Sequence, residues 1–447
     1  MIALGVIYYQ ASPAGNGFDQ ERFLRISSRM SEAVSQGEMI GGAGLLARNG
    51  RVLYQENYGM ADKKNAMPVT DDTLFRIYSM TKPITTVAVL MLYEQGRFLL
   101  QDPIAKYLPE LKDLKVALST SSVASSNSAV GDGTTIEGGQ SSDSSLRGQF
   151  ATPGRQPTII DLLTHTAGFS YGIFGATEVD QLYQAAGLGA ANLSLEEYTR
   201  RLGKIPLQYE PGDRWHYSIA TDVLGRLVEV ISGKTFGEFL QTEIFEPLGM
   251  NHTQFRVSEA EWHTLARLYS PSGTSGDLHS AFGSVHEAAM LEEAPPSFDR
   301  GFKEDAVFES GGGGLLSTIR DYYRFCQMLL NGGELEGKRI LSPKTVQLMT
   351  MNHLDSNETV WDTAGRGFGL GVAVSLSPAE LMRIGSAGEY NWGGAAGTSF
   401  WIDPVENMIG IFFTQSMPHT TTLRDEFKQL SYQSLIESYV GKNQQCR

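Results

Sequence analysis

This chain contains the stretch Ile77-Tyr78-Ser79-Met80-Thr81-Lys82-Pro83, which is followed by an apolar run over residues 84–92. Ser79 and Lys82 are three residues apart, so on a helix they share one face and the lysine amine can reach the serine hydroxyl. A hydroxyl becomes a nucleophile when an adjacent base takes its proton. Pro83 is tolerated only in the first turn of a helix. The stretch therefore predicts a reactive serine at the start of a buried helix.

The same spacing of serine and lysine also arises by chance in a chain of this composition. A surface serine that caps a core helix would produce the same letters, without any catalytic role. Other stretches must therefore support the catalytic interpretation of Ser79 before it is preferred.

Composition and charge limit the classes of function. The 447 residues are 41% hydrophobic and 10% aromatic, which is typical of a globular protein with a large core. The net charge of -14 argues against nucleic acid or an anionic membrane as a partner. Two distant cysteines, Cys326 and Cys446, form neither a disulfide framework nor a metal cluster. Without a basic leader or a run of about 20 apolar residues, a cytoplasmic protein is expected.

The two ends of the chain carry the signals of an antiparallel sheet. Residues 18–36 have helical periodicity, and residues 40–47 and 52–58 are apolar or alternating runs joined by Asn49-Gly50, which predicts a hairpin. Near the other end, four short apolar runs separated by turns predict strands, and a final amphipathic helix is predicted over residues 423–439. The runs lie at residues 368–376, 381–385, 398–402 and 408–414.

The middle of the chain is different. Residues 119–148 are rich in Ser, Gly and Thr, which predicts a flexible surface insertion. Helical patterns dominate the rest of this part. We therefore expect a domain with an antiparallel sheet, formed by residues 1–100 and 340–447, and a mainly helical domain over residues 101–339 inserted between its two halves.

Two further stretches raise Ser79 above chance. A tight turn at Glu210-Pro211-Gly212 places Tyr217 just before a helix, where a phenol next to an ammonium can carry a proton to a leaving group. The alternative for Tyr217 is a half-buried aromatic residue with a hydrogen-bonded hydroxyl. The stretch Trp392-Gly393-Gly394 allows a backbone to approach a ligand closely, and a free N–H there can complete an oxyanion hole. Its alternative is a glycine-rich turn or bulge.

Taken in order, these stretches resemble the serine β-lactamase and penicillin-binding-protein superfamily, in which S-x-x-K is a defining motif. The chain is most similar to the class C-like branch and, within it, to the family VIII carboxylesterases. The resemblance extends from about residue 20 to residue 440, apart from the insertion. It is carried by Ser79-Met80-Thr81-Lys82, residues 162–168, Tyr217-Ser218, residues 311–318 and Trp392-Gly393-Gly394.

The resemblance implies an α+β fold of the β-lactamase/DD-peptidase type, with an antiparallel sheet flanked by helices and an inserted helical domain. It implies that Ser79 accepts the acyl group, that Lys82 is its base partner and that Tyr217 protonates the leaving alcohol. The backbone N–H groups of Ser79 and Ala395 would form the oxyanion hole. The reaction would be acyl transfer from a small-molecule ester to Ser79, followed by deacylation by water.

The chain departs from the β-lactamase pattern at two positions. Ile219 follows Tyr217-Ser218 where a β-lactamase has Asn, and Trp392-Gly393-Gly394 replaces Lys-Thr-Gly. The missing lysine would have contributed roughly 1–3 kcal/mol to binding of a substrate carboxylate. Trp392, Gly393 and Gly394 are therefore expected to bind an apolar acyl or aryl group, and esters are favoured over β-lactams.

A competing serine lies in Gly168-Phe169-Ser170-Tyr171-Gly172, which matches the G-x-S-x-G elbow of α/β-hydrolases. That elbow requires a strand before the serine and a helix after it, whereas a helical run over residues 159–163 and a turn come before Ser170. We expect this loop to border the substrate cleft, with Tyr171 as a pocket residue. No metal site or cofactor is expected, since His286-Glu287 is followed by Met290 and not by the second histidine of H-E-x-x-H.

Three alternatives remain open from the sequence. An acyltransferase, resembling the lovastatin-type enzymes, would pass the acyl group to an alcohol. A weak β-lactamase or DD-peptidase activity is the second alternative. The third, of another class, is a non-catalytic relative that uses the cleft only to bind a ligand.

Overall fold

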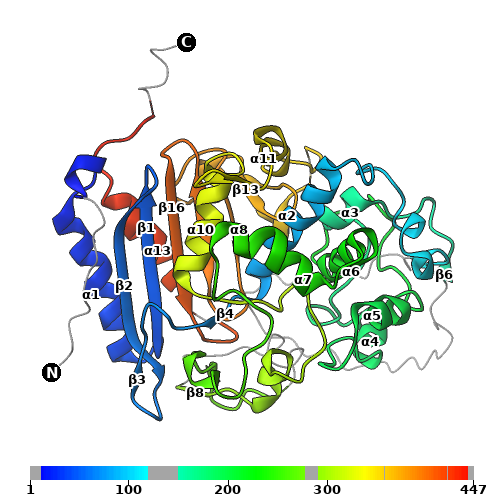
Figure 1. Cartoon of the computed structure of the whole chain (residues 1–447), viewed down its shortest axis with the longest axis horizontal. Coiled ribbons are helices and arrows are strands. Elements are labelled where there is room, and N and C mark those ends of the chain that lie inside the picture. Colours follow the sequence, from blue (N-terminus) through cyan, green and yellow to red (C-terminus); the bar gives the residue numbers. More distant parts are fainter. Residues whose placement is uncertain (1–11, 119–149, 277–289, 357, 420, 441–447) are drawn as a thin grey trace, which may run out of the picture.

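The computed structural model describes residues 12–118, 150–276, 290–356, 358–419 and 421–440. The insertion predicted over residues 119–148 lies outside the described residues. Within the described part, an eight-stranded antiparallel sheet is covered by helices on both faces, as Figure 1 shows. This is the predicted α+β architecture, an antiparallel sheet flanked by helices.

The hairpin predicted near the N-terminus is confirmed. Strand β1 (Gly41–Arg48) pairs with β2 (Arg51–Asp62) through a two-residue turn. Asn49 and Gly50 form this turn with φ values of 56° and 72°. Positive φ at both positions gives a turn whose twist matches that of the flanking strands, which is why Asn-Gly is favoured there.

The two ends of the chain meet inside one sheet. The strand order β12-β13-β14-β15-β16-β1-β2-β3 places β16 (Met408–Thr414) beside β1, in register from Gly42↔Thr414 to Arg48↔Met408. This confirms the prediction that the N- and C-terminal parts share a sheet. The remaining strands of the sheet are β3 (Met67–Pro68), β12 (Arg366–Phe368), β13 (Ala373–Ser375), β14 (Tyr390–Gly393) and β15 (Ser399–Asp403).

Helices from both ends of the chain cover one face of the sheet. α1 (Gln20–Gln36) packs against α13 (Leu423–Gln433); in Figure 1, α1 lies to the left of β2 and α13 is partly hidden behind the strands. On the other face, α10 (Ile319–Leu330) packs against β16. α2 (Thr81–Glu94) continues this second layer and packs against α6 (Ala220–Ser232). Ser79, just before α2, therefore lies where the sheet and the helical part meet.

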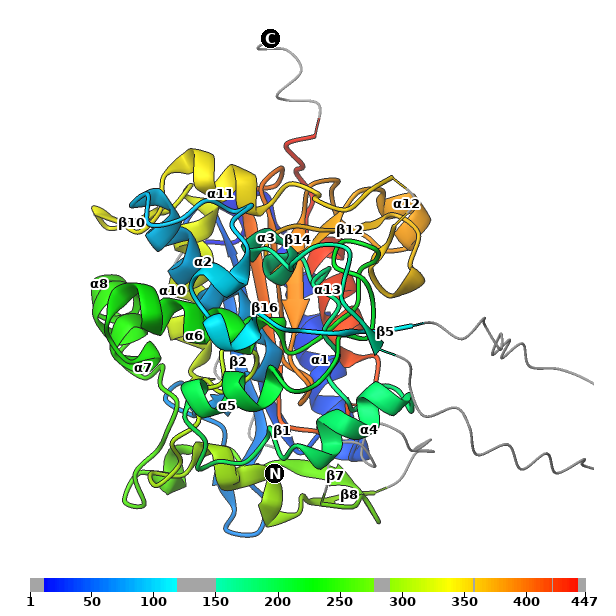
Figure 2. The same ribbon diagram turned by 90° about the vertical axis from the view of Figure 1, so that its right-hand side faces the viewer.

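The helical part stands beside the sheet and faces the viewer in Figure 2. The range predicted as the helical domain, residues 101–339, also contains α10, which covers the sheet, so the division into two domains stays a prediction. The remaining helices are α3 (Ile159–Leu163), α4 (Glu178–Ala185), α5 (Leu195–Leu202), α7 (Phe236–Leu240), α8 (Glu246–Leu248), α11 (Pro343–Met349) and α12 (Pro378–Leu381).

A two-residue strand pair brings a distant glycine segment to Ser79. β4 (Phe75–Arg76) pairs with β9 (Leu316–Ser317), and the N–H of Ile77 donates to the Leu315 carbonyl at 3.1 Å. The glycines at 311–314 immediately precede β9, so this pairing fixes them against the start of α2. The other short strands are β5 (Val116–Ala117), β6 (Phe150–Ala151), β7 (Tyr269–Pro271), β8 (Leu291–Glu293), β10 (Glu334–Leu335) and β11 (Lys338–Arg339).

Three of the predicted elements differ from the structure. The single strand predicted over residues 368–376 is divided, because β12 ends at Phe368 and a turn leads to β13 (Ala373–Ser375), which pairs with it. The strand predicted over residues 381–385 is wrong, because Ser377 caps α12 by accepting the N–H of Glu380 and Pro378 occupies its first position. Met382 then ends that helix with φ 51°, and a turn follows. The final helix ends at Gln433 and not at residue 439.

Candidate active site

Ser79 lies in the single 3-10 turn Tyr78–Met80, directly before α2. Tyr78 has φ 41°, a backbone conformation that costs energy for a residue with a side chain and is found preferentially at functional sites. Pro83 is the third residue of α2, where its missing N–H removes no helical hydrogen bond. The predicted position of Ser79 at the start of a buried helix is confirmed.

Lys82 is completely buried and makes three hydrogen bonds. Its Nζ donates to Ser79 Oγ at 3.2 Å, to the Tyr171 hydroxyl at 2.8 Å and to the Gly312 carbonyl at 2.7 Å. These three partners match the three donors of an ammonium group. In the described part of the chain, Lys82 forms no ion pair with a carboxylate.

Two tyrosines surround the lysine. The Tyr217 ring lies 4.6 Å from Lys82 Nζ, and its hydroxyl accepts a hydrogen bond from Trp392 Nε1 at 3.4 Å. The Tyr171 hydroxyl also interacts with the side chains of Tyr217 and Ser79. Burial, reinforced by the neighbouring Tyr217 and Asp222, raises the pKa of Tyr171 well above its usual value. Tyr171 therefore stays protonated.

Asp222, on α6, supports the lysine indirectly. Its carboxylate accepts from the Gly312 N–H at 3.0 Å and from Ser310 Oγ at 2.5 Å. A Cβ on Gly312 would lie 2.8 Å from this carboxylate, so only glycine allows such a close approach. Because Gly312 donates to Asp222 and accepts from Lys82, it connects the two side chains through one peptide segment.

The end of β14 approaches Ser79 from the opposite side. A Cβ on Gly394 would lie 2.4 Å from the Ile77 carbonyl, so the glycine lets this strand pack directly on the turn that holds Ser79. In the described structure the Ala395 N–H donates to no other residue. Trp392, Gly393, Gly394 and Ala395 all line the same cavity as Ser79.

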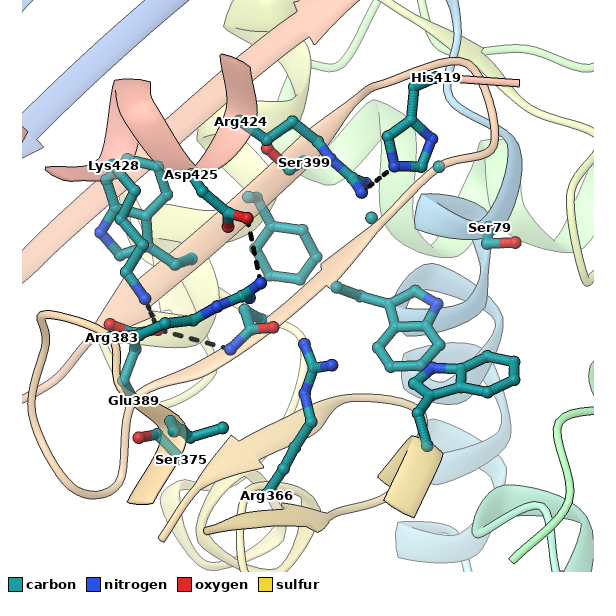
Figure 3. Close-up of a pocket in the computed structure, with 18 of the residues that line it drawn as sticks. Ser79, Arg366, Ser375, Arg383, Glu389, Ser399, His419, Arg424, Asp425 and Lys428 are labelled. Carbon is teal, nitrogen blue, oxygen red and sulfur yellow. Dashed lines mark hydrogen bonds and ion pairs between the residues drawn. The ribbon is translucent and has the colours of Figure 1, made fainter. Parts of the chain in front are cut away.

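The cavity has a volume of about 430 Å³ and two chemically distinct ends. Near Ser79 its wall is aromatic, formed by Phe174, Tyr217, Trp361 and Trp392. The other end is charged, and Figure 3 shows its arginines, lysine and carboxylates away from Ser79. The charged residues are Arg366, Arg383, Glu389, Arg424, Asp425 and Lys428.

The predicted site residues come together, with one difference in placement. Ser79, Lys82, Tyr217, Trp392 and the glycines converge as expected. Tyr171 is held against Lys82 and is not among the described residues that line the cavity, although it was expected to be a pocket residue.

Ser170 is a buried residue whose hydroxyl stabilises the local structure. Its hydroxyl donates to Asp180 at 2.5 Å and accepts from the Gly172 N–H at 3.1 Å, and its side chain is buried. The segment before it is α3 followed by a turn, so the strand that a nucleophile elbow requires does not precede this serine.

Sequence reasoning missed four residues near Lys82 or in the cavity: Asp222, Gly312, Arg366 and Arg424. Gly312 belongs to residues 311–318, which entered the sequence analysis only as part of the family resemblance, with no role for any single glycine. An aspartate in a helix and arginines in a strand and a helix look like ordinary surface residues. No local pattern marks them, because their role depends on neighbours far away in the chain.

Two kinds of feature are absent from the described residues, a metal-binding cluster and a membrane-spanning helix. In the ranges that the structure describes, no group of three or more His, Cys, Asp or Glu side chains is arranged to hold a metal ion. None of the described helices has both the length and the apolar character needed to span a lipid bilayer.

The sequence matches a known family model and is similar to several known proteins. A family model described as Beta-lactamase matches residues 26–432. Protein Rv1367c of Mycobacterium tuberculosis is 32% identical over 399 residues, which cover 87% of this chain and 88% of that protein. Esterase EstB of Burkholderia gladioli is 29% identical over 419 residues, which cover 90% of this chain and 94% of the esterase.

Solved structures with the same fold are also known. EstCE1, described as a hydrolase with promiscuous acyltransferase activity, has a TM-score of 0.73 at 25% identity, covering 92% of this chain and 99% of that one. Simvastatin synthase (LovD) from Aspergillus terreus has a TM-score of 0.73 at 21% identity, covering 93% and 98% of the two chains. The latter likeness concerns the fold alone.

Proposed function

Since this chain belongs to the β-lactamase family and is a serine hydrolase of the carboxylic-ester class, we propose that it cleaves esters through an acyl-enzyme formed on Ser79. One observation carries this proposal. The Ser79 hydroxyl and the buried Lys82 amine are 3.2 Å apart, and Ser79 and Ala395 line the same cavity. This supports a nucleophile beside its base, with the Ala395 N–H proposed as the oxyanion donor.

In the proposed reaction, Lys82 acts as a neutral amine, which keeps two N–H donors for Tyr171 and Gly312 and offers its lone pair to Ser79. Ser79 Oγ attacks the ester carbonyl as its proton passes to Lys82, and the N–H groups of Ser79 and Ala395 stabilise the negative charge on the carbonyl oxygen. Tyr217 delivers a proton to the leaving alcohol and receives in return the proton that Lys82 took from Ser79. Water then attacks the acyl-enzyme, and the proton that the water loses returns through the same groups to Ser79.

The cavity wall supports a preference for esters over β-lactams. Trp392 occupies the position where a β-lactamase carries a lysine, and Tyr217, Trp361 and Phe174 extend the aromatic surface near Ser79. Such a wall favours an apolar acyl or aryl group next to the reacting carbonyl, since aromatic side chains provide a large apolar contact area.

The test compares p-nitrophenyl butyrate and nitrocefin as substrates of the wild type, Ser79→Ala and Ser170→Ala. Loss of the nucleophile should reduce ester turnover by at least about 10³-fold, as for other serine hydrolases. Ser170→Ala is the matched control, and it should keep ester turnover within a few-fold, while nitrocefin is hydrolysed slowly. Turnover that survives Ser79→Ala, or is lost in a folded Ser170→Ala, would refute the proposal.

Acyl transfer to an alcohol is a second candidate, because EstCE1 is described as having promiscuous acyltransferase activity. Adding butanol to the p-nitrophenyl butyrate assay and measuring butyl butyrate by chromatography separates the two outcomes. Butyric acid as the sole product that carries the acyl group would exclude transfer to this acceptor. Labelling of Ser79 by a fluorophosphonate probe distinguishes either enzyme from a relative that only binds ligands.

A further inference from the structure

The charged end of the cavity has more cations than carboxylates. Four cationic side chains and two carboxylates face it, which leaves a net charge of +2 in a chain whose net charge is -14. Arg383 pairs with Asp425 at 3.0 Å, and Lys428 pairs with Glu389 at 2.5 Å. Both carboxylates are therefore already engaged.

Two guanidinium groups are left without an ion pair among the described residues, although Asp425 attracts both of them and Glu389 attracts Arg366. In the described structure neither Arg366 nor Arg424 forms an ion pair, and both side chains are half-buried in the cavity wall. In Figure 3 they reach into the cavity from opposite sides, Arg366 from β12 and Arg424 from α13. Burial lowers the pKa of Arg424 to about 10 and also lowers that of Arg366. A buried charge without a partner is costly, and an anion placed between two such charges offsets the cost.

Arg424 lies beside the end of β14, the strand that approaches Ser79. Its guanidinium contacts His419 Nε2. Because arginine can only donate, Nε2 must be the acceptor, and Nδ1 carries the proton that His419 shares with the Ala395 carbonyl at 3.4 Å. Burial lowers the pKa of His419 to about 4, so this histidine is neutral and adds no charge. A Cβ on Gly393 would lie only 2.6 Å from Arg424 Nη1, so the glycine makes room for the guanidinium.

We propose that Arg366 and Arg424 form a carboxylate-binding subsite, and that the preferred substrate is an ester with a carboxylate on the part that extends away from Ser79. Guanidinium groups match the planar geometry of a carboxylate and bind it with two parallel hydrogen bonds. Arg366 on β12 and Arg424 on α13 would thus supply the positive charge that the lysine of Lys-Thr-Gly supplies in a β-lactamase. This inference rests on the proposed esterase function, because the subsite is part of the same cavity.

The first experiment uses two pairs of substrates, each a carboxylate and its uncharged methyl ester, with kcat/KM divided by the rate constant of alkaline hydrolysis to correct for intrinsic reactivity. Mono-p-nitrophenyl adipate and its methyl ester place the carboxylate on the acyl side, and 4-acetoxybenzoate and its methyl ester place it on the alcohol side. In one of the two pairs, kcat/KM should be at least about tenfold higher for the charged member, which corresponds to about 1.4 kcal/mol. The pair that shows the preference identifies the side that faces the arginines.

The second experiment measures the same ratio in variants. Arg366→Gln and Arg424→Gln should each reduce the preference for the charged ester about fivefold or more, chiefly through KM. Arg51→Gln, at the exposed β1–β2 turn, removes the same charge far from the cavity and should leave the ratio within twofold. Raising the salt concentration should affect wild type and Arg51→Gln alike.

The outcomes separate this inference from the proposed function. A wild type that hydrolyses p-nitrophenyl butyrate through Ser79 but shows no preference in either pair would overturn the subsite alone. A preference that survives both arginine variants would overturn it as well. Absence of any Ser79-dependent ester hydrolysis would instead refute the proposed function. If one arginine variant fails to fold, the other variant and the conservative Arg366→Lys and Arg424→Lys replacements still test the assignment.

Discussion

At the scale of single residues, the site depends on how the hydrogen bonds of Lys82 are distributed. Its amine donates to Ser79, Tyr171 and the Gly312 carbonyl, while Tyr217 presents its ring to the amine and its hydroxyl to Trp392. Tyr171 is kept protonated by burial, which suits a residue that orients the lysine. We infer that Tyr217, which lines the cavity, is the tyrosine that exchanges protons with the leaving group.

Replacing each tyrosine with phenylalanine tests this assignment. Tyr217→Phe should lower kcat for ethyl butyrate, whose alkoxide leaving group needs a proton, by at least about 100-fold, the usual contribution of a general acid. Tyr171→Phe should lower kcat only about tenfold, because it removes one of three partners of Lys82. The two variants lose the same atom, so each is the control for the other. A larger loss in Tyr171→Phe would mean that the roles of the two tyrosines are exchanged.

At the scale of elements, the site is formed where β14 packs on the turn before α2. Gly394 permits this contact, because a Cβ there would lie 2.2 Å from Thr398 Oγ1 and 2.4 Å from the Ile77 carbonyl. The hydroxyl of a threonine can rotate away, but a backbone carbonyl cannot move without shifting the turn. Gly394 therefore allows the end of β14 to pack closely on the turn that holds Ser79.

Gly394→Ala should separate the strand from the turn. We expect kcat to fall about 10- to 100-fold, since small displacements of reacting groups cost this much, and the free energy of unfolding to fall by about 1–3 kcal/mol through overpacking. Gly189→Ala is the control, because a Cβ there would meet no atom within 4 Å. Kinetics and urea unfolding measure the two effects. A destabilised Gly394→Ala enzyme with unchanged kcat would show that the contact serves only the fold.

At the scale of the whole molecule, folding buries neutral histidines that an unfolded chain would protonate in mild acid. His165 is buried in a turn with φ 58°, and its Nδ1 lies 3.2 Å from Ser218 Oγ. Burial and the nearby Lys82 lower its pKa well below 6.5. Below pH 6.5 the unfolded state therefore binds a proton that the folded state does not, so stability is lost as the pH falls.

The contribution of His165 can be isolated with His165→Asn, since asparagine tolerates a positive φ. Between pH 7.5 and pH 5, the wild type should lose about 2 kcal/mol of unfolding free energy relative to this variant, at about 1.4 kcal/mol for each pH unit below 6.5. His263→Asn, at an exposed position, should run parallel to the wild type. Urea unfolding at several pH values measures the difference. Parallel curves for the wild type and His165→Asn would contradict the prediction.

Local features of the sequence determined much of the fold and the centre of the site. Asn49-Gly50 encodes its hairpin because both residues accept a positive φ. The spacing of Ser79 and Lys82, with Pro83 behind them, encodes a helix start in seven residues. The glycines after Trp392 indicate that the backbone is approached closely there, but they do not indicate which segment approaches it. Each of these signals is contained in a short window, where steric limits and periodicity act directly.

Only the tertiary structure decided which distant groups complete the site. The pairing of β4 with β9 brings Gly312 to Lys82, and the packing of α6 adds Asp222 behind it. The sheet brings Arg366 and Arg424 into one cavity with Ser79, although both arginines have the local pattern of surface residues. The role proposed for them depends on their burial and on the lack of an ion pair within the described part of the chain. Both properties depend on packing between segments far apart in the chain, which no local window contains.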